Sequence, residues 1–284
     1  MRKPIHIVLI LLLFITCTKV EIGEIENLNN GKIDVFGHGG LSFDHPFQPM
    51  PFNSWEALRF VIESTSADGV EVDVQITADS VAMIFHDSFL EGSTTCEGCI
   101  PLVDQDQLAN CNYLAGFPSE HHELEEVQRL LKFHEGHELA PLIYLDSKTS
   151  FNCLDEVATQ SHLQRMALAY WQLISIPERQ NRVWIIAGNT ILIGLIHALD
   201  PSIRIYLITS NFPSGIQSAM DLSCFGIIAT EQDITKNDVK MAHDNGLMVN
   251  IWGVGNAQQH IDAIKKNPDH IISDNISIAL GLLH

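Results

Sequence analysis

The stretch VEVDVQITADSVAMIFHD, residues 70–87, contains two apolar strand-like segments that carry charged groups. In the first, Glu71 and Asp73 stand two residues apart among valines, so both carboxylates project from one face of a strand. Neighbouring carboxylates repel one another, and a hard divalent cation, which prefers oxygen ligands, compensates that repulsion. The second segment ends in His86 and Asp87, an acid/base group near the predicted metal site. The alternative is a solvated strand end with both carboxylates in water.

The composition fits one large acidic domain. The chain has 284 residues, of which 46% are hydrophobic and 18% charged, enough to bury the core of an α/β barrel. Its formal charge of −19 argues against nucleic acid or anionic lipid as a partner, because both require a basic surface. An acidic protein binds a phosphate ester only where a metal ion or a lysine reverses the local charge.

The N-terminus reads as a targeting segment. Arg2 and Lys3 precede an apolar run at 7–15, which is too short to span a bilayer and is typical of a secretory signal. Cleavage would remove residues 1–16. The chain is therefore predicted to be exported.

Cys17 is a candidate lipidation site. The stretch FITC, residues 14–17, resembles a bacterial lipobox, although Thr16 is larger than the residue usual before the lipidated cysteine. An ordinary cleaved signal peptide is the alternative. The preferred interpretation is a lipoprotein with a tether at 17–31 and a catalytic barrel at 32–284, facing the periplasm or cell surface. Its membrane contact would then come from the N-terminal lipid alone.

Five cysteines follow the predicted leader: Cys96, Cys99, Cys111, Cys153 and Cys224. Export permits disulfides. The first three also suggest zinc, but no fourth ligand stands at a zinc-site spacing, and the pair at 121–122 is a loose candidate. A disulfide within the loop 92–120 is the preferred interpretation, and spacing does not reveal the pairing.

Strand-like and helix-like segments alternate along the rest of the chain. The candidate strands are nearly continuous apolar runs, as expected for parallel strands buried on both faces; they span 33–36, 70–76, 81–85, 141–145, 183–187, 203–208, 226–229, 247–252 and 270–273. Amphipathic stretches between them predict helices, for example at 54–65, 122–133, 154–171, 238–245 and 257–266.

This alternation predicts an α/β fold, a single (β/α)8 TIM-type barrel. A doubly wound open sheet is the alternative, but no glycine-rich dinucleotide loop follows an early strand. The nine candidate strands are one more than an eight-stranded barrel requires. Only residues 77–80 separate the second and third candidates, which is too few for a parallel crossover, so we expect a local irregularity there.

Groups able to do chemistry follow several predicted strands. Asp146 and Lys148 repeat the two-residue spacing, so an acid and a base share one face. Each group alone is more often a hydrogen-bonded strand end or a surface ion pair. Their joint occurrence at the carboxyl ends of barrel strands indicates an active site.

The chain resembles the glycerophosphodiester phosphodiesterase family from about residue 33 to the C-terminus. Seven stretches match the family's motifs in order: His38-Gly39-Gly40, Phe52-Asn53-Ser54, Glu71-Val72-Asp73, His86-Asp87, Asp146-Ser147-Lys148, Trp252-Gly253-Val254 and Ser273-Asp274. The resemblance implies the TIM-type barrel of PLC-like phosphodiesterases.

Three positions depart from the family pattern. Gly39 replaces an arginine, which removes a bidentate phosphate donor that a lysine replaces only in part. Phe52 replaces a glutamate, and Asp146 replaces a longer glutamate ligand.

The resemblance also implies the chemistry. One Mg²⁺ or Ca²⁺ would be held by Glu71, Asp73 and Asp146. The general acid and base would be His38 and His86, in either order. Substrate would contact three further residues: Lys148, Trp252 and Asn53. The substrate would be a small phosphodiester, and the products glycerol 3-phosphate and an alcohol.

Two other functions stay open. The first is a non-catalytic barrel lipoprotein that binds a phosphorylated ligand, which the residues Gly39 and Phe52 favour. The second is a hydrolase of another metal-barrel type. That type needs a His-x-His pair at the first strand end, whereas His38 is followed by two glycines.

Overall fold

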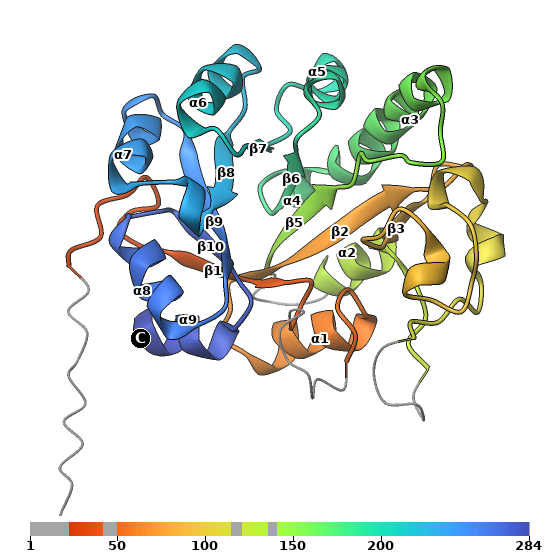
Figure 1. Ribbon diagram of the computed structural model, residues 1–284, viewed down its shortest axis with the longest axis horizontal. Coiled ribbons are helices and arrows are strands. Elements are labelled where there is room, and N and C mark those ends of the chain that lie inside the picture. Colours follow the sequence, from red (N-terminus) through yellow and green to blue (C-terminus); the bar gives the residue numbers. More distant parts are fainter. Residues whose placement is uncertain (1–22, 42–49, 115–120, 136–140, 284) are drawn as a thin grey trace, which may run out of the picture.

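The computed structural model describes residues 23–41, 50–114, 121–135 and 141–283. Eight parallel strands form a closed barrel, and helices surround it (Figure 1). The barrel closes because β1 (Asp34–His38) pairs with both β10 (His270–Ser273) and β2 (Gly69–Ile76). The predicted single (β/α)8 barrel is thereby confirmed, and an open sheet, whose edge strands would not pair with each other, is excluded.

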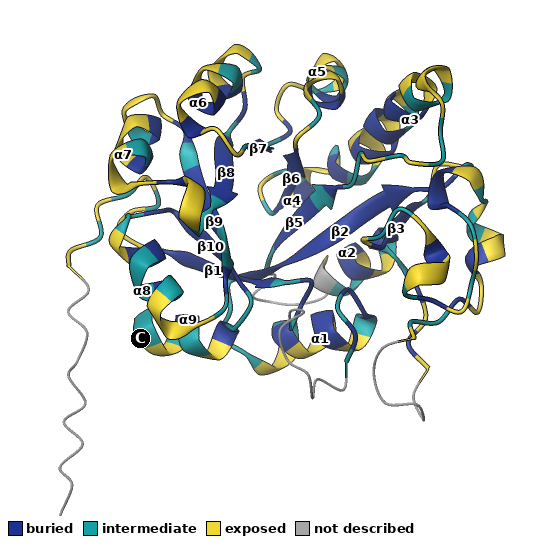
Figure 2. Cartoon of the chain, viewed as in Figure 1, coloured by how far each residue is buried: buried dark blue, intermediate teal, exposed yellow. Residues whose placement is uncertain are grey.

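The other barrel strands follow in chain order: β5 (Leu142–Ser147), β6 (Val183–Ala187), β7 (Ile205–Ile208), β8 (Gly226–Thr230) and β9 (Met248–Val254). The helices are α1 (Trp55–Ser64), α2 (Val127–Glu135), α3 (Glu156–Ile174), α4 (Pro177–Gln180), α5 (Thr190–Leu199), α6 (Phe212–Asp221), α7 (Lys236–Asp244), α8 (Ala257–Lys265) and α9 (Ile276–Leu283). Figure 2 shows buried strands enclosed by helices that are buried on one side and exposed on the other. This explains why the strands read as continuous apolar runs and the helices as amphipathic ones.

The surplus strand is β3 (Ala82–Ile84), which pairs antiparallel with β2 and lies outside the barrel order. The tight turn at 77–81 permits only this hairpin arrangement. A two-residue strand, β4 (Glu125–Glu126), pairs in turn with β3. The helix predicted at 122–133 therefore begins only at Val127, because the backbone just before it is engaged in the ladder with β3.

The long connection between β3 and β4, which we call the excursion, contains three short 3₁₀ helices, at Leu90–Gly92, Ile100–Leu102 and Gln105–Leu108. Two disulfides hold it: Cys96–Cys111 lies within the excursion, and Cys99–Cys153 joins it to the loop after β5. The preferred disulfide interpretation is confirmed. These four cysteines are not zinc ligands, and Cys224 is a buried free thiol.

Aromatic side chains fill the barrel beneath the carboxyl ends of the strands. Tyr144 and Tyr206 are fully buried, and both hydroxyls lie near Nδ1 of His270, at 2.8 and 3.4 Å. The ring of Trp184 stacks on the same imidazole at 5.2 Å. Because side chains alternate along β5, Tyr144 and Asp146 face the same way. The aromatic layer therefore forms a floor below the acidic residues.

The segment before β1 contacts the N-terminal end of the barrel. Glu26 N donates to Asn267 Oδ1 at 3.2 Å, and Asn27 Nδ2 donates to Pro268 O at 2.7 Å. The later part of the predicted tether is thus attached to the loop before β10. The predicted signal peptide and Cys17 lie outside the described residues.

Candidate active site

The three predicted metal ligands converge where β2 lies beside the carboxyl end of β5. The parallel pairing of these strands places Asp73 directly beside Asp146, and alternation along β2 puts Glu71 on the same inward face. One carboxylate oxygen from each residue lies within 4.8 Å of the other two. The acidic cluster is therefore brought together by the pairing register of β2 and β5 rather than by closeness in the sequence.

Glu71 and Asp73 are buried and Asp146 is partly buried, and burial disfavours their negative charge. Burial and the neighbouring charge of Asp73 raise the pKa of Glu71 to about 8. Burial also raises the pKa of Asp146, against the opposing effect of Lys148. A positive charge beside these carboxylates would favour the ionised form of Glu71 and Asp146.

Lys148 supplies one positive charge to this cluster. Its Nζ lies 2.7 Å from Asp73 Oδ1 and 2.6 Å from Asp146 Oδ2. Burial would lower the pKa of Lys148, but the charges of Asp146 and Asp73 outweigh it and raise that pKa. The ammonium is therefore charged, and it balances one of the three carboxylates.

Asn53 holds Asp73 in place. Its side chain is only 1% exposed; Nδ2 donates to Asp73 Oδ2 at 2.6 Å, and Oδ1 accepts from Asp73 N at 3.2 Å. Asn53 has φ +63°, a left-handed conformation in which asparagine is enriched. The resemblance implies a substrate contact for Asn53; in this geometry its carboxamide contacts a predicted metal ligand.

His38 stands at the end of β1 on one side of the cluster. Its Nδ1 lies 2.5 Å from Asp274 Oδ1, and its Nε2 lies 3.9 Å from Glu71 Oε2. Burial would lower the pKa of His38, but the hydrogen bond to Asp274 and the charge of Glu71 raise it to about 9. Asp274 orients this imidazole so that Nε2 is directed toward the acidic cluster.

His86 follows β3 and makes an equivalent pair with its neighbour. Its Nδ1 lies 2.8 Å from Asp87 Oδ1, and Ser93 Oγ donates to Asp87 Oδ2 at 2.8 Å. Gln75 Nε2 donates to Asp87 O at 2.6 Å, which ties the segment to β2. His86 is much more exposed than His38, with 46% of its side chain accessible against 18%.

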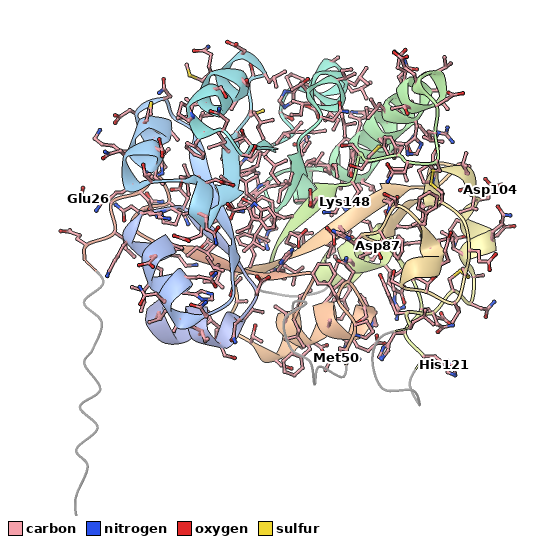
Figure 3. The ribbon with its side chains drawn as sticks, viewed as in Figure 1. Glu26, Met50, Asp87, Asp104, His121 and Lys148 are labelled. Carbon is pink, nitrogen blue, oxygen red and sulfur yellow. A yellow bond between two sulfur atoms is a disulfide. The ribbon has the colours of Figure 1, made fainter. Side chains whose placement is uncertain are left out.

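A cavity of about 280 Å³ brings these groups together. Its polar lining comprises His38, His86, Glu71, Asp146 and Lys148, and its apolar lining comprises Trp252, Ile186, Ile208, Ile228 and Ile272. We call this space the catalytic cavity. Figure 3 labels Lys148 and Asp87, which lie at the same end of the barrel; Lys148 directly follows β5, and Asp87 belongs to the segment after β3. Predicted residues from five separate motifs thus line one space.

Phe52 is the aromatic neighbour of both histidines. Its ring centroid lies 5.2 Å from that of His38 and 6.4 Å from that of His86, with both pairs edge to face. Trp252 is a second aromatic neighbour of His38, and the centroids of these two rings lie 6.2 Å apart. An aromatic side chain thus stands at the position where the family pattern has a glutamate.

Sequence reasoning missed two supporting residues, Gln75 and Ser93. Gln75 continues the inward alternation of Glu71 and Asp73, so the strand period alone points to it. No local pattern identifies Ser93, because its contact with Asp87 depends on the path of the excursion.

Residues 38–278 match the Glycerophosphoryl diester phosphodiesterase family. An uncharacterized Bacillus subtilis protein, YqiK, is 33% identical over 82 residues, which make up 29% of this chain and 31% of that protein.

Solved structures share the fold. A phosphodiesterase from Oleispira antarctica, in complex with the product sn-glycerol-3-phosphate, has a TM-score of 0.74 and 17% identity over 88% of this chain and 96% of that chain. A glycerophosphodiester phosphodiesterase from Parabacteroides distasonis has a TM-score of 0.70 and 19% identity over the same shares.

Proposed function

Since the family match extends over most of the barrel, the chain belongs to the glycerophosphoryl diester phosphodiesterase family, and we propose that it hydrolyses glycerophosphodiesters to glycerol 3-phosphate and an alcohol. The observation that carries this proposal is the arrangement of the catalytic cavity. Two histidines, each bonded through Nδ1 to a carboxylate, share it with a lysine and two of the three clustered carboxylates.

The acidic cluster fits one divalent cation, either Mg²⁺ or Ca²⁺. Its donors are three carboxylate oxygens, the ligand type that hard cations prefer. Burial and repulsion from Asp73 raise the pKa of Glu71, and a bound cation would favour its ionised form against both. When bound by Glu71, Asp73 and Asp146, the ion would neutralise the diester and act as a Lewis acid.

Lys148 is proposed to bind a non-bridging phosphate oxygen. An ammonium has three N–H donors, and its contacts with Asp73 and Asp146 account for two of them. The third can be donated to the substrate. Trp252 would form a wall for the glycerol portion.

The two histidines are proposed to move the protons. One accepts a proton from the attacking oxygen, which belongs to a glycerol hydroxyl or a water, as the new P–O bond forms. The other donates a proton to the alcohol oxygen as the old P–O bond breaks. If a cyclic phosphate forms first, the two roles reverse when water opens it. Overall, one water is consumed.

A substrate panel tests the activity. The mature protein, supplied with Mg²⁺ or Ca²⁺, should release glycerol 3-phosphate and an alcohol from several glycerophosphodiesters. His86→Ala should lose this activity while retaining its fold and its metal affinity. Absence of release from every diester with both metals would refute the proposed hydrolysis.

A specific observation favours a second candidate, a barrel that binds a phosphorylated ligand without turnover. The Phe52 ring contacts both imidazoles where the family pattern has a charged residue. This candidate predicts saturable binding of glycerol 3-phosphate and no release of alcohol, so the same panel separates the two functions.

We further propose that the protein is exported and anchored through Cys17. The apolar run at 7–15 supports export, and the two disulfides do so as well, because such bonds persist mainly in oxidising compartments. Every helix in the described part of the chain is too short or too polar to span a bilayer. Cys17→Ser should move the protein from the membrane fraction to the soluble fraction; unchanged fractionation would contradict the anchor.

A further inference from the structure

A broad uncharged surface covers α3 and α5, two helices that pack against each other on the outside of the barrel (Figure 1). Five large apolar side chains are exposed on them: Val157, Leu168 and Trp171 on α3, and Ile191 and Leu199 on α5. Between 37% and 75% of each residue is accessible. We call the exposed side of α3 from Val157 onward, together with the exposed side of α5, the α3–α5 face.

The helix α5 is apolar on both of its sides. Leucine and isoleucine form its buried side, and Ile191, Gly194, Ala198 and Leu199 lie on its exposed side at spacings of one helical face. The outer side of a surface helix is normally polar, and a helix that is apolar all round is typical of one that is covered on both sides. The outer side of α5 therefore has the composition of a buried surface.

The α3–α5 face also lacks charge, in a chain with 35 acidic and 16 basic residues. The stretches 157–172 and 190–199 are fully described, and none of their exposed residues is acidic or basic. Their two basic side chains, Arg165 and His197, are partly buried and bonded to backbone carbonyls. By contrast, α7 exposes two lysines and an aspartate.

This distribution of charge favours a second copy of the chain as the occupant. With a formal charge of −19, two copies repel each other wherever their acidic surfaces meet. A two-fold interface opposes one surface to itself, so a surface without charge meets its copy without this repulsion. Depletion of charged residues and the presence of tryptophan are also typical of the centre of a protein interface.

The α3–α5 face contains complementary shapes. A Cβ atom on Gly194 would meet nothing within 4 Å, and Ala198 lies one turn further along α5, so this strip of the face is low and open. Trp171 and Leu168 on α3 are bulky and exposed. In a two-fold pair, the bulky side chains of one copy fill the low strip of the other, and the reverse contact forms by symmetry.

A lipid bilayer fits the same face less well. Helices that lie on membranes flank their apolar side chains with lysine and arginine. The polar residues exposed on α3 are instead uncharged, and they include Gln160, Gln164 and Gln172. Each carboxamide needs hydrogen-bond partners when it is covered, and a protein interface supplies them whereas acyl chains do not.

We propose that the α3–α5 face joins two copies of this chain in a two-fold symmetric dimer. Every residue in the lining of the catalytic cavity lies outside α3 and α5, so both cavities stay open in the dimer. The inference is therefore independent of the proposed hydrolysis.

Sedimentation equilibrium of the mature protein tests the dimer. Cys17→Ser is included in every sample, because it removes the proposed lipid as a cause of association. We expect a mass twice that of the chain at micromolar concentration. A monomer at every concentration would overturn the inference.

Charged variants test whether the dimer uses this face. Leu168→Glu and, separately, Ile191→Glu should each weaken dimerisation at least about tenfold, because the contact would bury an unpaired carboxylate. Both positions are exposed, and circular dichroism checks that the variants fold. Met241→Glu is the matched control, because Met241 is an exposed apolar residue on α7, 41% accessible against 48% for Leu168, and it should leave the dimer unchanged.

Two outcomes would assign the face differently. Equal dimer stability in the two face variants and in Met241→Glu would overturn the inference. A monomer that binds phosphatidylcholine vesicles and loses this binding in Leu168→Glu would also overturn it, because the face would then belong to a membrane.

Discussion

A Cβ atom on Gly39 would lie 2.1 Å from Cε2 of the Phe52 ring, so the ring covers the glycine directly. The backbones of the two segments are also joined, because Asn53 N donates to Gly39 O at 2.9 Å. Gly39 and Phe52 are two of the three departures from the family pattern. In space they form one contact, and the ring occupies the volume in which a side chain at position 39 would begin.

This contact predicts a coupled pair of substitutions. Gly39→Ala should destabilise the fold by about 1–3 kcal/mol, as overpacking does, and Phe52→Ala should relieve most of that loss in the double variant. Urea unfolding of the four proteins measures the coupling. Gly246→Ala isolates backbone strain, because Gly246 has φ +75° with nothing near its Cβ position. An equal loss for Gly39→Ala and Gly246→Ala would contradict the predicted clash.

The position of His86 in the lining of the catalytic cavity predicts a dependence on the leaving group. His86→Ala should lower kcat by about 100- to 10,000-fold for diesters with alkyl alcohols, which need a proton to leave. The loss should be much smaller for a p-nitrophenyl ester, because its phenolate leaves unprotonated. His121→Ala serves as a control from an exposed position. Equal losses on both substrates would exclude His86 as the general acid.

The buried contact between Asn53 and Asp73 predicts an effect on metal affinity. Asn53→Gly keeps the left-handed backbone but removes both hydrogen bonds to Asp73, so Mg²⁺ and Ca²⁺ should bind about 10- to 100-fold more weakly in calorimetry. Asn110→Gly is the matched control, because Asn110 also has a positive φ and is exposed. Unchanged affinity in Asn53→Gly would show that Asp73 needs no such support.

The two disulfides should contribute unequally to stability. Cys99–Cys153 spans 54 residues and Cys96–Cys111 spans 15, so the first restricts the unfolded chain more. Replacing both cysteines of the longer bridge with serine should cost about 1 kcal/mol more than doing so for the shorter one. Chemical unfolding of the two double variants compares these losses. A larger loss for the shorter bridge would contradict the prediction.

The burial of His162 predicts that the stability of the fold depends on pH. It is fully buried against Phe151, neither ring nitrogen has a hydrogen-bond partner among the described residues, and burial lowers its pKa to about 4. Because the unfolded state then binds the proton more tightly, stability is complete above about pH 6.5 and falls toward pH 4. His162→Leu should make the free energy of unfolding less pH-dependent across that window. An unchanged slope would show that His162 is not responsible.

Local patterns were sufficient to predict most of the fold. Apolar runs such as 183–187 and 203–208 predicted parallel barrel strands, and the short turn at 77–80 correctly marked the place of the irregular strand. The start of α2 was missed because residues 125–126 pair with β3, a contact that leaves no periodic signal. The pairing of Cys99 with Cys153 was likewise not readable from spacing.

The sequence by itself determined which groups exist and which face of a strand each occupies, since alternation along a strand is a property of the backbone. It placed Glu71 with Asp73 and Asp146 with Lys148 before any contact was known. Only the tertiary structure decided which groups meet. Three features arise from packing between distant segments: barrel closure between β1 and β2, the register of Asp73 beside Asp146, and the contact of the Phe52 ring with Gly39. No local pattern encodes that packing.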